Sequence, residues 1–145
     1  MSESLLLTRP HLQLAALCEK HLVDKDNVVS LIRIIDRFII AGTDESLPPT
    51  VLIFTLAVMF KAGNFRGRAE VGVEPLSPSM AKMGEMKMSV NFDAGDDQGV
   101  NILSQVKLEV TEEGLHWLIV SFAGEEYTRI PLRVVYQKQP SIQTG

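Results

Sequence analysis

The amino-acid sequence predicts one all-β domain, an antiparallel immunoglobulin-like β-sandwich of about eight strands. Apolar and polar residues alternate with period two over several stretches, which is typical of strands with one buried face. Turn-forming residues separate these stretches at short intervals, and no helical pattern alternates with them. Short strands without intervening helices favour two packed antiparallel sheets.

The clearest alternation runs through residues 85–92. Its apolar side chains share one face of a strand, whereas a helix would spread them around its circumference. The same period recurs in residues 65–73 and 100–110, so we expect strands there as well. The inward residues of the first stretch are Met86, Met88, Val90 and Phe92.

Two further strands are more apolar. Residues 28–40 are rich in Val, Ile and Leu, and charged residues interrupt the run only at Arg33, Asp36 and Arg37. Residues 51–60 are almost wholly apolar. A continuous apolar run of strand-forming residues indicates a central strand that is buried on both faces.

The final hairpin is expected from residues 115–122 and 127–136, which a turn at residues 123–126 separates. Pro131 falls within the second of these strands. Because proline has no N–H to donate to a neighbouring strand, we expect this strand to lie at an edge or to carry a bulge.

Residues 12–22 fit either a strand or a helix. As a strand they place Leu12, Leu14, Ala16 and Cys18 on one face. We favour the strand, because residues 24–27 (Asp-Lys-Asp-Asn) then form the loop of a first hairpin.

The 145 residues suit a single domain, which we place at residues 10–136. An extension at residues 1–9 precedes it, and a polar tail at residues 137–145 is expected to be disordered. Residues 75–84 are expected to form a long loop, either mobile or holding a short helical turn.

Composition narrows the class of protein. The net charge of −4 argues against nucleic acid as a partner, because phosphate binding needs a basic face. Cys18 is the single cysteine, so we expect a buried, inert thiol and no disulfide. No apolar run is long enough to span a membrane, and the first residues lack the basic start of a signal peptide. These features predict a cytoplasmic protein that binds neither nucleic acid nor membrane.

Three segments occur together in a recognisable order: residues 29–39, the Leu47-Pro48-Pro49 lead into the apolar run, and residues 114–134. In this order they resemble an uncharacterised family of bacterial β-sandwich proteins, a domain of unknown function. The resemblance covers about residues 10–136. It implies a bacterial or phage source and a compact sandwich, and it supplies no activity.

No catalytic constellation is visible in the sequence. His11, His21 and His116 have no histidine, cysteine or carboxylate at metal-ligand spacing. There is no GxSxG nucleophile motif, no phosphate-binding GxxxxGK[ST] loop and no GxGxxG dinucleotide fingerprint. We therefore expect that the protein is not an enzyme and that it has neither catalytic residues nor a cofactor.

Three groups of residues are candidates for binding. Asp93, Asp96 and Asp97 share one loop and offer oxygen ligands of the kind that Ca²⁺ prefers. Methionines can form an adaptable apolar contact surface, and arginines on an edge strand can dock a partner. The residues concerned are Met80, Met83, Arg129 and Arg133.

The function that remains is a non-catalytic protein-interaction or accessory module of a bacterial or phage assembly, with a protein partner or a homo-oligomer. The alternative is a sandwich domain whose end loops bind a small ligand or Ca²⁺.

Overall fold

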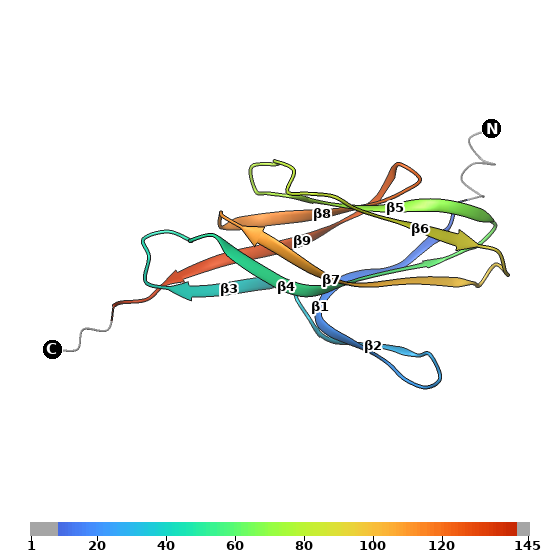
Figure 1. Cartoon of the computed structure of the whole chain (residues 1–145), viewed down its shortest axis with the longest axis horizontal. Helices are drawn as coiled ribbons and strands as arrows, with labels where there is room; N and C mark the ends of the chain where they lie inside the picture. Colours follow the sequence, from blue (N-terminus) through green and yellow to red (C-terminus); the bar gives the residue numbers. More distant parts are fainter. Residues whose placement is uncertain (1–8, 142–145) are drawn as a thin grey trace.

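The computed structural model describes residues 9–141, which form nine strands in two stacked sheets (Figure 1). The strands are β1 (His11–Val23), β2 (Val29–Ile34), β3 (Arg37–Gly42), β4 (Thr50–Lys61), β5 (Gly67–Leu76), β6 (Met86–Phe92), β7 (Gly99–Val110), β8 (Gly114–Phe122) and β9 (Glu125–Lys138). One sheet has the order β2-β1-β4-β7 and the other the order β3-β9-β8-β5-β6. The all-β, sandwich-like fold is confirmed, with nine strands in place of the expected eight and with one parallel pair, β3 and β9, among otherwise antiparallel strands. Residues 9–141 contain no helix that is long and apolar enough to cross a bilayer.

The core lies between the two sheets and is built from the inward side chains of alternating strands. At one end it consists of aromatic rings from both sheets, whose centroids lie 5.2–6.2 Å apart. Phe60 comes from β4 and Phe122 from β8, so this cluster ties the sheets together. The cluster consists of Phe60, Phe65, Phe92, Phe122 and Tyr127.

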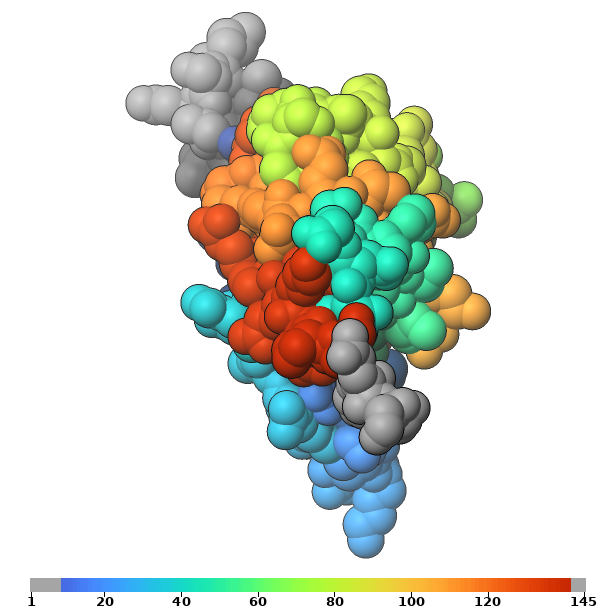
Figure 2. Space-filling view, turned by 90° about the vertical axis from the view of Figure 1, so that its left-hand side faces the viewer, coloured from blue at the N-terminus to red at the C-terminus, as the bar shows by residue number. Residues whose placement is uncertain are grey.

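The first hairpin, β1–β2, has the predicted strand–loop–strand build. The Asp24 carboxylate accepts hydrogen bonds from the backbone N–H groups of Asp26 (2.8 Å) and Val28 (3.0 Å). Asn27 has a left-handed φ of 62°, which asparagine tolerates better than most residues. β1 pairs with β4 only from His11 to Cys18, and beyond Cys18 it pairs with β2 alone. The rest of the hairpin leaves the sandwich as a two-stranded projection (Figures 1 and 2).

The expectation of one strand over residues 28–40 is wrong. Arg33 adopts a left-handed φ of 56°, and the Ile35 N–H donates to the Leu17 carbonyl at 2.7 Å. The chain then crosses at Asp36 to the other sheet, where β3 pairs in parallel with β9. The three charged residues that were expected to interrupt one strand therefore lie where the chain crosses from β2 to β3.

The expectation that residues 51–60 are buried on both faces is confirmed for only part of the strand. β4 is a central strand, as predicted, and its inward side chains such as Phe54 and Leu56 are fully buried. On its outer face Thr55 and Ala57 are buried, whereas Val51 and Ile53 are each 53% exposed, so this face is open to solvent only at the start of the strand.

Pro131 lies where β9 has a neighbour on one side only. It pairs with Trp117 of β8, whereas β3 covers β9 only from Arg133 to Lys138. The strand is therefore an edge at Pro131, as its missing N–H requires, and becomes interior further on.

The tail assignment is partly wrong, since Gln137 and Lys138 belong to β9; residues 142–145 lie outside the described part. Residues 1–8 of the expected extension also lie outside it.

Candidate functional site

The aspartates of the 93–97 loop do not converge on one point. The Asp96 carboxylate accepts a hydrogen bond from Arg66 at 2.6 Å, and the Asp93 carboxylate accepts one from Asn91 at 3.2 Å. The Lys61 ammonium lies 3.4 Å from the backbone carbonyl of Asp97, not from its carboxylate. Within the described ranges no group of three or more acidic, histidine or cysteine side chains is arranged to hold a metal ion.

Arg129 and Arg133 share the exposed face of β9, as predicted. The Arg129 guanidinium is held by Glu126 through two hydrogen bonds of 2.9 and 3.0 Å. This contact raises the pKa of Arg129 and lowers that of Glu126. Arg129 is thus engaged in a local ion pair, and Arg133 lies opposite Arg37 in the parallel pairing.

Met80 and Met83 lie in different environments. Met80 is 52% exposed at the tip of the β5–β6 loop, whereas Met83 packs against the core. The loop is held by its own hydrogen bonds, among them Met80 N–H to the Ser77 carbonyl at 2.8 Å and Met83 N–H to the Pro75 carbonyl at 2.9 Å. The two methionines therefore form no common contact surface.

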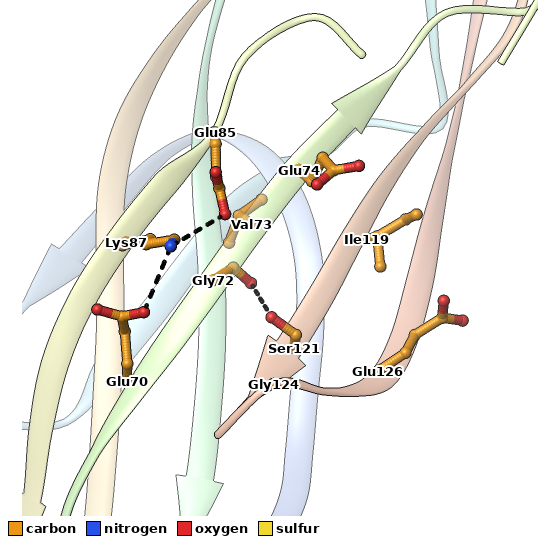
Figure 3. Close-up of a pocket in the computed structure, with 10 residues that line it drawn as sticks. All are labelled: Glu70, Gly72, Val73, Glu74, Glu85, Lys87, Ile119, Ser121, Gly124 and Glu126. Atoms are coloured by element: carbon orange, nitrogen blue, oxygen red, sulfur yellow. Dashed lines mark hydrogen bonds and ion pairs between the residues drawn. The ribbon is translucent and has the colours of Figure 1, made fainter. Parts of the chain in front are cut away.

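A shallow hollow of about 310 Å³ lies on the outer face of the five-stranded sheet (Figure 3). Its floor is Gly72 of β5 and Ser121 of β8, where an added Cβ at Gly72 would come within 2.7 Å of the Ser121 hydroxyl. Lys87 lies 3.7 Å from Glu70 and 3.6 Å from Glu85 in ion pairs exposed to solvent. Ion pairs exposed to solvent in this way contribute little to the stability of the fold. The residues that line the hollow include no nucleophile–base pair.

His116 is the one buried histidine of the described residues, at 1% exposure. Its Nδ1 lies 3.3 Å from the Gly114 carbonyl, and its Nε2 has no hydrogen-bond partner among the described residues. Burial lowers the pKa of His116, because the charged imidazolium is disfavoured away from water. Its hydrogen-bond partner within residues 9–141 is a backbone carbonyl, so its position is that of a core residue with one unsatisfied nitrogen.

We predict that His116→Leu stabilises the protein and weakens its dependence on pH. Relieving an unsatisfied buried nitrogen should raise the free energy of unfolding by about 1 kcal/mol at pH 7.5. The unfolded chain binds a proton below its pKa of about 6.5, whereas the folded chain resists protonation. The stability of the natural protein therefore falls as the pH drops below about 6.5, and the variant should lack this component.

Urea denaturation at pH 7.5 and at pH 5.5 measures this difference. His11→Gln, which alters an exposed histidine, is the control and should keep the pH dependence of the natural protein. An identical pH dependence in His116→Leu and the natural protein would contradict the account of His116.

Cys18 is fully buried, as predicted, although it points to the outer face of its sheet beside Thr55 of β4. Burial raises the pKa of its thiol, so the reactive thiolate is disfavoured.

The feature that sequence reasoning missed is the apolar surface of the β1–β2 projection and of the sheet at its base. We call residues 19–34 the arm; its exposed apolar residues include Leu22 (53%), Val23 (50%), Val28 (58%) and Ile34 (68%). The register places Leu22 and Ile34 on one face of the arm, together with Cys18, and Val23 on the other. Val51 and Ile53 continue the exposed apolar surface on the outer face of β4.

The sequence contains apolar residues on both sides of the 24–27 loop, but it does not show that the hairpin leaves the core. Figure 2 shows the tip of the arm standing clear of the rest of the molecule. The arm therefore presents apolar side chains on both faces to solvent.

No family model matches the chain, and no curated protein matches it significantly.

Proposed function

We propose that the protein is a non-catalytic protein-interaction module that binds a partner protein through its arm. The observation that carries this proposal is the exposure of Leu22, Val23, Val28 and Ile34 on a hairpin that projects from the core. A two-stranded hairpin is at best marginally stable alone in water, and soluble proteins seldom leave clustered apolar residues exposed without use. A partner with a complementary apolar surface would stabilise the arm by covering it.

The arm also offers main-chain hydrogen bonds. β2 is the edge strand of its sheet, and β1 has lost β4 as a neighbour beyond Cys18. Both long edges of the arm are therefore open within the described part of the chain. A partner strand added to either edge would pair with it, while the apolar side chains provide specificity.

An accessory role in a bacterial or phage assembly, and a cytoplasmic location, remain part of this proposal. So does the immunoglobulin-like relationship, which the two-layer build supports, although β3 and β9 pair in parallel. No described contact favours the Ca²⁺ alternative, because the nearest polar partner of the Asp96 carboxylate is Arg66.

We predict that a triple variant, Leu22→Ser, Val28→Ser and Ile34→Ser, loses the partner without losing the fold. Exposed substitutions of this kind usually change stability by within about 0.5 kcal/mol. In affinity capture from cells that make the protein, the natural chain should retain a discrete partner that the triple variant fails to retain. Ile39→Ser is the matched control, since Ile39 is 57% exposed on β3 of the other sheet. Equal capture by all three proteins would contradict the proposal.

A further inference from the structure

The two sheets have four edge strands, and one of them is unlike the others. β2, β3 and β6 have 6, 6 and 7 residues, whereas β7 has 12. Long, regular edge strands pair readily with other chains, and proteins usually blunt them with short length, charged side chains, proline, bulges or inward charges. β7 has no proline and pairs with β4 without a register shift.

The inward face of the second half of β7 carries no charge that would oppose pairing with another strand. Its inward residues Val106, Leu108 and Val110 are all apolar and buried. On the outer face Lys107 and Glu109 are exposed, and neither forms an ion pair with any residue in 9–141. Their neighbours on β4 are the exposed Ile53 and Val51. Two charges of opposite sign thus lie two residues apart on an open edge.

We propose that β7 pairs antiparallel with β7 of a second copy of this chain, around a two-fold axis at Leu108. Paired residues in an antiparallel sheet lie on the same face, so outward residues must meet outward residues. With Leu108 opposite its own copy, each Lys107 lies opposite Glu109 of the other copy, and this contact occurs twice. Registers centred on Lys107 or on Glu109 would instead place like charges opposite each other.

The hollow between β6 and β7 lies along the first half of β7, and the proposed contact uses the second half. Residues 88–91 of β6 and 100–104 of β7 line a hollow at the open side of the sandwich. The proposed contact uses residues 106–110, beyond this hollow. It joins the two four-stranded sheets into one continuous sheet and brings Val51 and Ile53 of both copies to the same outer face.

This surface is separate from the arm, so the self-association and the proposed function can fail independently. Lys107 and Glu109 lie on the opposite edge of the sheet from β2. Variants at these two positions therefore leave the arm unchanged.

Sedimentation equilibrium of the purified full chain tests the proposal, with circular dichroism to show that each variant is folded. The natural protein should be a dimer, and Lys107→Glu or Glu109→Lys should each raise its dissociation constant by about tenfold or more, because each places like charges opposite in two contacts. The double variant with both changes should return the dissociation constant to within about threefold of the natural value, because opposite charges again face each other across the contact. Lys87→Glu, a charge reversal on the β6 edge, is the control and should leave the dimer unchanged.

A natural protein that stays monomeric up to about 1 mM overturns the proposal. So does a dimer that both single substitutions leave unaffected. A dimer that the single changes weaken and the double change does not restore overturns the register and with it the proposed contact.

Discussion

Replacing Phe122 by alanine is expected to lower the free energy of unfolding by about 3–5 kcal/mol. Phe122 is 3% exposed, and its ring lies 5.4 Å from Phe60, 5.2 Å from Phe65 and 5.8 Å from Tyr127 between centroids. The substitution removes a large apolar surface and leaves a cavity where the two sheets meet. A loss of this size is a large part of the roughly 5–15 kcal/mol that stabilises a typical domain.

Urea denaturation followed by circular dichroism measures the effect of Phe122→Ala. Phe38→Ala is the control, because Phe38 is only partly buried and its ring contact with Phe54 is 6.0 Å between centroids. Phe38→Ala should lower the free energy of unfolding clearly less than Phe122→Ala does. A loss below about 1 kcal/mol for Phe122→Ala would show that the aromatic cluster does not hold the sheets together.

Gly114→Ala is expected to be the second most destabilising change, at about 2 kcal/mol or more. Gly114 begins β8 with a left-handed φ of 124°, which residues with a Cβ rarely adopt. An added Cβ would also lie 3.1 Å from Cβ and Cγ of Pro78 in the β5–β6 loop. The cost therefore combines backbone strain with crowding between β8 and this loop.

Gly84 allows the two terms to be separated. It has a similar φ of 132°, but an added Cβ there would meet no atom within 4 Å. In thermal or urea unfolding, Gly84→Ala should report backbone strain alone and cost less than Gly114→Ala. Equal costs at the two positions would mean that the contact with Pro78 does not contribute.

The sequence predicts those parts of the fold that depend on local alternation. β6 follows from the period-two pattern of residues 85–92, and the turn after β1 follows from the Asp24 carboxylate and a left-handed Asn27. The break between β2 and β3 could not be predicted, because charged residues within an apolar run are equally typical of a strand with one solvated face. What separates the strands is the backbone conformation of Arg33 and the crossing at Asp36.

The candidate site was predicted less well, because it depends on which surfaces the rest of the chain covers. The apolar outer face of β4 indicates burial by composition, yet Val51 and Ile53 are exposed. Likewise, Asp93 and Asp96 are close in sequence but hydrogen-bond to different neighbours. Whether an apolar strand is exposed depends on how the sheets pack, and a local sequence pattern does not predict this.

The most direct test of the interaction function is site-specific photo-crosslinking in cells that make the protein. A photoreactive amino acid would replace Ile34 on the arm or, as the matched control, Ile39 on β3. Our account predicts a discrete crosslinked species with a partner protein from position 34 and none from position 39. No crosslink from position 34, or the same product from both positions, would contradict the claim that the arm is the binding surface.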